Sequence, residues 1–102
     1  MAKVVWTEGA LRDLDEIADY IGKRNAEAAN RLVKQVFDRV DLLESFPELG
    51  RFEPELPGQV HRRLVVGPVK VIYRLERGAA LIEMVVRGER LLTEQLLKQK
   101  IF

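Results

Sequence analysis

Cysteine is absent from the 102 residues of this sequence, and histidine occurs once, as His61. The lack of cysteine rules out disulfides, thiolate metal sites and a cysteine nucleophile, and a lone histidine is a poor basis for a zinc site. Small secreted domains commonly rely on disulfides, so their absence favours a reducing compartment. We therefore expect a protein that binds no metal and no cofactor.

Long hydrophobic runs are also missing from the sequence. No uncharged apolar stretch approaches the roughly 20 residues that a membrane-spanning helix requires. Near the N-terminus, Glu8 comes too early in the chain to leave room for the apolar core of a signal peptide. Both absences predict a cytoplasmic protein that does not engage a membrane.

The residues that are present suit a single domain spanning residues 1–102. Apolar residues make up 47% of the chain and charged residues 32%, which is typical of a globular protein with one core. The net charge is +1, but residues 1–50 carry −3 and residues 51–102 carry +4. This asymmetry indicates either a basic face for an anionic partner or an ordinary spread of surface charge.

The first part of the chain has the pattern of a short strand followed by an amphipathic helix. Lys3–Trp6 is the expected strand, Thr7 stands at the N-cap of the helix, and Gly22 lies near its end. The charged residues between the apolar positions, Asp13 among them, are expected on the solvated face. The apolar stripe consists of Ala10, Leu14, Ile17, Ala18 and Ile21.

A second amphipathic helix follows after a short connection. Asn25 is its expected N-cap, and it should stop by Phe46-Pro47 because proline disfavours helical geometry in the residue before it. Two such helices form an αα-hairpin with both stripes turned to one partner. The second stripe consists of Ala28, Ala29, Leu32, Val33, Val36, Val40 and Leu43.

Beyond Gly50 the helical period gives way to strand-like segments. These are Val60–Val66, Val69–Leu75 and Ala80–Arg87, and glycine-containing turns separate them. Two short hairpins imply an antiparallel meander with one face packed on the helices. Strict alternation would place Ile82, Met84 and Val86 on the same face.

The predicted fold class is therefore α+β. It has an N-terminal strand, an αα-hairpin and a three-stranded antiparallel meander packed on the helices. Residues 91–102 form a short amphipathic C-terminal helix or a tail.

This order of elements and several local motifs resemble the ParE/RelE superfamily of toxins from type II toxin–antitoxin systems. The first helix has an Ala-x-x-Asp-Leu core that leads to an Ile-x-x-Tyr-Ile end, and the resemblance covers nearly the whole chain. The stretches that carry it are Ala10–Ile21, Asn25–Ala29, Phe46–Arg51, Arg63–Pro68, Lys70–Arg74 and Val86–Arg90.

The resemblance implies two candidate activities on one fold. RelE-like members cleave messenger RNA on the ribosome with basic residues and usually a tyrosine or histidine on the concave sheet face. ParE-like members lack that set and inhibit DNA gyrase. Because one fold serves both activities, the residues must decide between them.

RNA cleavage needs a base, an acid and cations that stabilise the phosphorane. Matching the family motifs places His61, Arg63, Lys70 and Arg90 at the basic positions of the ribonuclease. Alternation along the strands puts residues 61, 63 and 65 on one face, and likewise 70, 72 and 74. At the position of the ribonuclease tyrosine this chain has Leu96, which neither accepts nor donates a proton.

Simpler roles fit several of these residues. His61 suits an exposed position at a strand edge, and Tyr73 and Trp6 suit core packing. We expect surface ion pairs between three basic residues, Arg62, Arg74 and Arg87, and the acidic residues Glu76, Glu83 and Glu89. Arg63, Lys70 and Arg90 coincide with family positions, so we expect them to bind the target.

The C-terminal segment carries many apolar residues for a free end. Those residues either cover the sheet or leave room for an antitoxin peptide that docks as a helix or adds as a strand. The resemblance implies an acidic antitoxin and a toxin–antitoxin hetero-oligomer. The expected antitoxin contacts are Leu92, Leu96 and Leu97.

The first hypothesis is a ParE-like toxin that inhibits DNA gyrase by binding and is neutralised by a ParD-like antitoxin. The alternative is a RelE-like enzyme that cuts mRNA on the ribosome with Arg63, Lys70, Arg90 and His61. A third reading is an inert relative that retains only antitoxin binding. The absence of the tyrosine at Leu96 favours the first.

Overall fold

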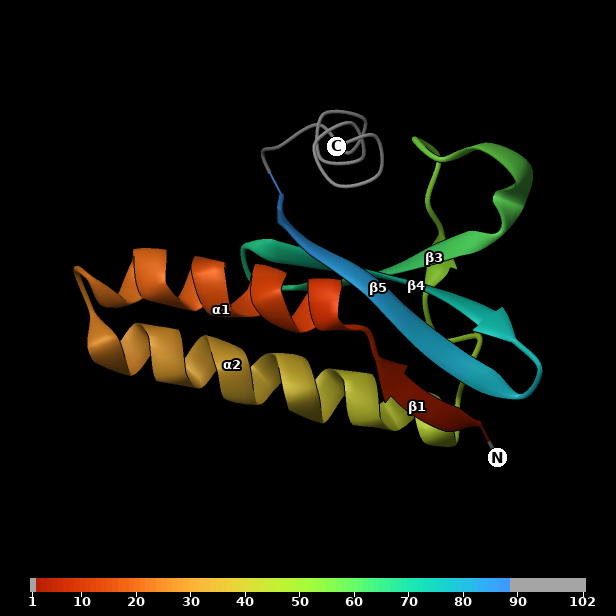
Figure 1. Ribbon diagram of the computed structural model, residues 1–102, viewed down its shortest axis with the longest axis horizontal. Coiled ribbons are helices and arrows are strands. Elements are labelled where there is room, and N and C mark those ends of the chain that lie inside the picture. Colours follow the sequence, from red (N-terminus) through yellow and green to blue (C-terminus); the bar gives the residue numbers. More distant parts are fainter. Residues whose placement is uncertain (1, 89–102) are drawn as a thin grey trace.

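The computed structural model describes residues 2–88, and these residues form two helices packed on one face of a five-stranded sheet (Figure 1). The α+β class predicted from the sequence is confirmed. In chain order the elements are β1 (Lys3–Trp6), α1 (Glu8–Gly22), α2 (Ala26–Asp41), a 3₁₀-helix (Leu42–Glu44), β2 (Arg51–Phe52), a second 3₁₀-helix (Pro57–Gln59), β3 (His61–Val66), β4 (Val69–Glu76) and β5 (Ala79–Arg87).

Both helices begin at the predicted caps. The Thr7 hydroxyl accepts a hydrogen bond from the Ala10 amide at 3.1 Å, and the Asn25 side chain accepts one from the Ala28 amide at 3.0 Å. Each cap satisfies an amide that the first helical turn leaves without a partner. Helix α2 ends at Asp41 and a 3₁₀-helix continues to Glu44, so helical structure stops before Phe46-Pro47 as expected.

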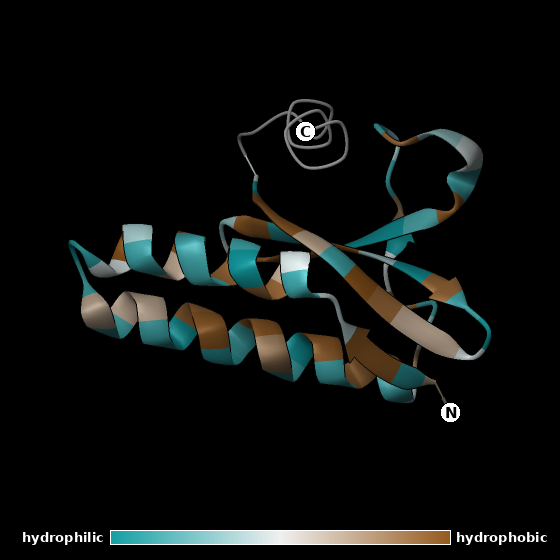
Figure 2. Cartoon of the chain, in the orientation of Figure 1, coloured by the Kyte–Doolittle hydropathy of each residue, from teal (hydrophilic) through white to brown (hydrophobic). Residues whose placement is uncertain are grey.

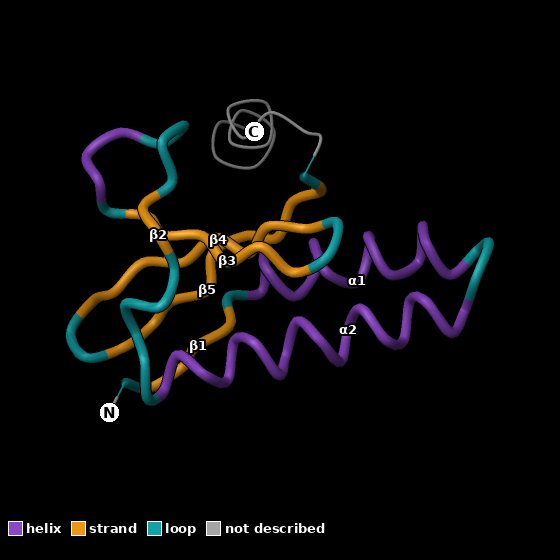
Figure 3. The backbone as a smooth tube through the Cα atoms, turned by 180° about the vertical axis from the view of Figure 1, so that it is seen from behind, coloured by secondary structure: helices purple, strands orange, loops and turns teal. Residues whose placement is uncertain are grey.

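The sheet has two strands more than the predicted meander. Its order is β1-β5-β4-β3-β2, with β1 parallel to β5 and the other pairs antiparallel (Figure 3). Strand β2 contains only Arg51 and Phe52, which is too short to produce a visible alternation. The pairing of β1 with β5 joins residues more than seventy positions apart, so no local pattern indicates it.

The main core lies between the helices and the sheet, where the apolar stripes of both helices meet (Figure 2). Trp6 of β1 packs against Phe37 of α2 with ring centroids 4.9 Å apart. Aliphatic burial of this kind supplies most of the driving force for folding. The buried residues of this core are Ala10, Leu14, Ile17, Leu32, Val36, Val40, Leu43, Leu64, Val66, Val69, Val71, Tyr73, Ala80, Ile82 and Val85.

A β-bulge in β5 corrects the predicted alternation. Ile72 pairs with Met84 and Tyr73 pairs with Ile82, so Glu83 is the extra residue in β5. Ile82 therefore belongs to the main core, whereas Met84 and Val86 join Leu56 and Ile72 in a second cluster. The prediction that Ile82 shares a face with Met84 and Val86 is wrong because the bulge reverses the side-chain direction between them.

Asp13 corrects a second expectation, because it is buried and only 6% exposed. Its carboxylate accepts a hydrogen bond from the Val85 amide of β5 at 3.0 Å. Strand β1 pairs with β5 only as far as Ile82, and Asp13 satisfies a backbone amide beyond that point. Within residues 2–88, neither helix has the length and hydropathy of a membrane span.

Candidate functional site

The sheet face opposite the helices, here called the far face, gathers the predicted basic residues. Leu64 and Val66 of β3 and Val69 and Val71 of β4 belong to the main core, so the residues between them point to the far face. The register of β3 with β4 and of β4 with β5 then brings together His61, Arg63, Lys70, Ile72, Arg74 and Glu83. The predicted grouping of residues 61 and 63 with 70 and 74 agrees with this register.

Arg63 and Lys70 converge on a buried carboxylate, that of Glu53. The guanidinium of Arg63 lies 3.4 Å from both Oε atoms of Glu53, and the ammonium of Lys70 lies 3.5 Å from Oε1. The Glu53 side chain is fully buried, whereas those of Arg63 and Lys70 are 29% and 21% exposed. The two proposed target-binding cations are therefore engaged within the chain.

The environment of Glu53 favours its charged form. Burial disfavours the carboxylate, but the Glu55 amide, Lys70 and Arg63 outweigh burial and hold the pKa of Glu53 below its ordinary value. The Glu55 amide donates to Oε2 of Glu53 at 3.0 Å. A buried charge is tolerable only with such partners, so Glu53 and its two cations behave as one unit.

His61 contacts a second carboxylate, that of the bulge residue Glu83. Its Nε2 lies 2.8 Å from Oε1 of Glu83, and Nε of Arg74 lies 3.3 Å from the same oxygen. Arg74 also contacts Glu76 at 2.9 Å, which confirms the ion pairs predicted for Arg74. Among the described residues, no partner reaches the buried Nδ1 of His61.

Arg62 differs from its predicted surface ion pair, and Arg87 contacts an aromatic ring. Arg62 donates to the carbonyl oxygen of Gly50 at 2.8 Å, and its guanidinium carbon lies 4.1 Å from the centroid of the Phe52 ring. The guanidinium carbon of Arg87 lies 4.8 Å from the centroid of the Tyr20 ring on α1. Both side chains bind an aromatic face, a contact that charge counting does not reveal.

The Phe46–Arg51 motif folds onto Tyr73, which is buried in the main core as predicted. The Tyr73 hydroxyl accepts from the Gly50 amide and donates to the carbonyl oxygen of Pro47, both at 2.8 Å. A Cβ at Gly50 would lie 2.6 Å from the carbonyl oxygen of Arg63 and 2.7 Å from the Tyr73 ring. Glycine is therefore required at position 50, and the motif serves to anchor a loop.

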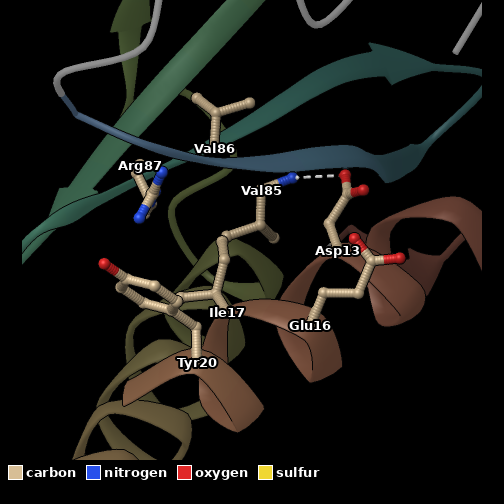
Figure 4. A pocket seen from close by; sticks show the side chains of 7 residues that line it. All are labelled: Asp13, Glu16, Ile17, Tyr20, Val85, Val86 and Arg87. Atoms are coloured by element: carbon tan, nitrogen blue, oxygen red, sulfur yellow. Dashed lines mark hydrogen bonds between the residues drawn. The ribbon is translucent and has the colours of Figure 1, made fainter. Parts of the chain in front are cut away.

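A pocket of about 300 Å³ lies beside the edge of β5 that β1 leaves open (Figure 4). Asp13, Ile17 and Tyr20 reach it from α1, while Val85 and Arg87 reach it from β5. The bond from the Val85 amide to Asp13 crosses one side of the pocket. The pocket is lined by both apolar and charged side chains.

Sequence reasoning missed the roles of Asp13 and Glu53, and for Glu83 it predicted ion pairs but not the contact with His61. A signal existed for Asp13, which falls in register with Ala10, Leu14 and Ile17 on the buried stripe. Glu53 and Glu83 carried no such signal, because one lies in an irregular segment and the other is the bulge residue. Arg90, Leu92, Leu96 and Leu97 lie outside the described residues. Residues 2–88 contain no cluster of three or more potential metal ligands.

Comparison with known proteins defines the class to which this fold belongs. The family described as "ParE toxin of type II toxin-antitoxin system, parDE" matches residues 4–91. The chain belongs to this family and is therefore a toxin of a type II toxin–antitoxin system.

Two particular proteins illustrate the likeness. Toxin RelE2 of Caulobacter vibrioides is 44% identical over 72 residues, which cover 71% of this chain and 77% of that protein. A solved structure titled "Chromosomal ParDE TA system from P. aeruginosa" superposes with a TM-score of 0.74 at 26% identity. The match covers 87% of this chain and 98% of the other. One relative thus carries a RelE name and the other a ParE name.

Proposed function

We propose that this toxin acts by binding its target and not by cutting RNA, that the target is DNA gyrase, and that a ParD-like antitoxin neutralises it. The supporting observation is the state of the far face. Arg63 and Lys70 lie against Glu53, and His61 lies against Glu83. Glu53 already neutralises part of the positive charge that an RNA phosphate would need at the first two cations.

The acid–base inventory supports the same proposal. Cleavage of an RNA strand requires one group that takes a proton and another that gives one. Leu96 stands where the ribonuclease has its tyrosine, and the Nε2 atom of His61 is directed at Glu83. The far face is therefore better suited to recognition than to proton transfer.

One observation favours the alternative of a RelE-like ribosome-dependent ribonuclease. The 2.8 Å contact between His61 and Glu83 is the arrangement in which a carboxylate orients a histidine base. The name of the Caulobacter vibrioides relative points in the same direction. In that case His61, Arg63, Lys70 and Arg90 would be the active residues.

A paired assay on the purified protein separates the two activities. One arm measures DNA supercoiling by gyrase, and the other measures cleavage of messenger RNA during translation. We expect inhibited supercoiling with intact messenger. Cleaved messenger with unaffected supercoiling would overturn the proposal and assign the activity to the basic residues of the far face. If neither arm responds, the protein is a relative that only binds antitoxin.

We further propose that Arg63, Lys70 and Arg90 contact the target. The variants Lys70→Gln and Arg90→Glu should abolish toxicity while the protein remains folded, because Arg63 still pairs with Glu53 in the first and the second changes only the charge of a proposed target contact. Lys34→Gln is the control, since Lys34 is an exposed residue of α2 that pairs only locally with Asp38. Full growth inhibition by both test variants would contradict this assignment, with circular dichroism verifying the fold.

For antitoxin binding we propose an apolar contact through Leu92, Leu96 and Leu97, with the antitoxin docking as a helix or adding as a strand. Leu96→Asp should then weaken capture by the antitoxin and leave gyrase inhibition unchanged. The hetero-oligomer would be detected by size-exclusion chromatography with light scattering. Unchanged capture would show that the antitoxin binds elsewhere, for example at the pocket beside Tyr20.

A further inference from the structure

A segment of the chain occupies the far face as a bound peptide would. Residues 53–59 connect β2 to β3, and two of their side chains are buried, Glu53 at 2% and Leu56 at 6% exposure. Pro54, Glu55 and the 3₁₀-helix Pro57–Gln59 are exposed. The segment projects from the sheet on the side away from the helices (Figures 1 and 3). The Glu53 amide donates to the carbonyl oxygen of His61 at 2.8 Å, and the two buried side chains add further contacts with the sheet.

The first of these contacts is ionic. Glu53 places both carboxylate oxygens near the Arg63 guanidinium and one near the Lys70 ammonium. The distances of 3.4 to 3.5 Å are longer than the 2.7–2.9 Å typical of strong charge-assisted hydrogen bonds. The two cations keep part of their surface in solvent. Another carboxylate could approach them from that side.

The second contact is apolar and lies three residues further along. Leu56 packs in a cluster with Ile72 of β4 and with Met84 and Val86 of β5. Methionine adapts to different apolar partners more readily than a branched side chain. The far face thus offers an anion-binding pair beside an aliphatic surface.

The end of the segment is strained. Gly58 has φ 84° and Gln59 has φ 48°, and the left-handed region is unfavourable for a residue such as Gln59 that has a Cβ. Opening the segment would release that strain. The segment therefore has features of an element that can leave the sheet without unfolding the core.

We propose that Glu53 and Leu56 fill a binding site for an acidic peptide segment of a partner protein, and that such a segment displaces residues 53–59. The ligand carries a carboxylate for Arg63 and Lys70 and an aliphatic residue three positions later. This inference rests on the proposed function, because it assigns a ligand class to the same two cations. It adds that the free protein covers its own site.

The chemistry of the face favours a peptide over a nucleic acid. Proteins that bind single strands stack bases on aromatic side chains. Among the described residues, the far face carries no phenylalanine, tyrosine or tryptophan. Phe52 pairs with Arg62 and so shares the opposite face, while Tyr73 and Trp6 belong to the side of the main core. Aliphatic residues beside a cation pair fit a leucine and a glutamate.

A peptide complementation experiment tests the proposal. The double variant Glu53→Gln/Leu56→Ala of the full chain removes the internal ligand groups while the connection to β3 stays in place. The probe is a fluorescent synthetic peptide of residues 51–60 with the natural Glu53 and Leu56. Controls are the same peptide with both substitutions and a single-stranded oligonucleotide of ten nucleotides. Binding is measured by fluorescence anisotropy without gyrase.

We expect the double variant to bind the natural peptide at least tenfold more tightly than the wild type, whose tethered segment competes at a high effective concentration. The substituted peptide should bind the double variant at least tenfold more weakly than the natural peptide does. Equal binding of both peptides, or no binding by a folded variant, overturns the proposal. Preferential binding of the oligonucleotide overturns the peptide assignment. Peptide binding without gyrase inhibition would refute the proposed target alone.

Hydrogen exchange in the wild type provides an answer even where the variant does not fold. The Glu55 amide is bonded to the Glu53 carboxylate, and the Leu56 amide is bonded to the carbonyl oxygen of Glu53 at 3.2 Å. A displaceable segment predicts that both amides exchange at least tenfold faster than the Gly50 amide bonded to Tyr73. Exchange of all three at one common rate would overturn the proposal.

Discussion

The helix-covered face of the sheet buries aliphatic and aromatic side chains from every long element, whereas the far face pairs carboxylates with basic residues around a small apolar cluster. Fifteen buried residues form the main core and four form the second cluster, within the described part of the chain. Packing of the first kind contributes most of the stability of a small domain. Charge pairs of the second kind contribute little net stability, but they determine what can bind.

The largest effect should follow from a cavity in the main core. Leu43 is fully buried, so Leu43→Ala should lower the free energy of unfolding by about 2–5 kcal/mol. The neighbouring Leu42 is 43% exposed, and Leu42→Ala should change it by about 0.5 kcal/mol or less. Urea denaturation of both variants measures the contrast. Similar losses of unfolding free energy in the two variants would contradict the expectation that the buried leucine contributes more stability than the exposed one.

A smaller effect is expected at Tyr73 of the main core, whose hydroxyl holds the loop from Pro47 to Gly50. Tyr73→Phe leaves the Gly50 amide without its acceptor, which should reduce stability by about 1–3 kcal/mol. Burial raises the pKa of the Tyr73 hydroxyl above its ordinary value of 10.0. The folded state thus favours the neutral phenol, and its stabilisation is present below pH 10 and lost as the pH rises further. Tyr20→Phe, at a residue 59% exposed, is the control.

If Tyr73→Phe were as stable as the wild type, the loop from Pro47 to Gly50 would not depend on the hydroxyl. A control that lost as much as Tyr73→Phe would equally remove the contrast between a buried and an exposed tyrosine. Thermal unfolding between pH 8 and pH 11 measures both the loss and its pH dependence.

On the far face, the effect of Glu53 should depend on pH. Its folded pKa lies below the ordinary value of 4.5, so its stabilisation is complete above that pH and is lost as the pH falls through the folded pKa. Glu53→Gln should flatten the loss of stability in acid. Glu44→Gln, at an exposed position, should leave the acid limb unchanged. An acid limb that is identical in Glu53→Gln and wild type would contradict the assignment.

The smallest effect is expected at Arg74, which pairs with Glu76 and Glu83 while 32% of its side chain is exposed. Arg74→Gln should lower stability by about 1 kcal/mol or less, because partly solvated ion pairs gain little over water. Chemical denaturation at low and high salt measures the change. A loss comparable with that of Leu43→Ala would show that the far face stabilises the fold as strongly as the main core.

The sequence predicted the elements whose causes are local. Thr7 and Asn25 cap the helices because a side-chain oxygen reaches an amide three residues away. The pairing of β1 with β5 and the short strand β2 depend on distant partners, so neither could be predicted. Asp13 was misplaced because it was judged by residue type, although its position lies on the apolar stripe.

In the candidate site, too, the features with local causes could be predicted and those that depend on distant residues could not. Alternation along β3 and β4 correctly grouped the basic residues on one face. It could not reveal that Glu53 reaches Arg63 and Lys70 from an irregular segment. Nor could it reveal that the bulge turns Glu83 toward His61, because strict alternation assumes an uninterrupted register.

The position of Trp6 has a practical consequence for spectroscopy. The chain has one tryptophan, and its ring lies against Phe37 on the helical side of the sheet. Its intrinsic emission therefore reports the docking of β1 on α2 without any label. Exchange of residues 53–59 for another peptide should leave this emission unchanged, whereas global unfolding should shift it to longer wavelength. One natural chromophore thus distinguishes ligand exchange from denaturation in the same cuvette.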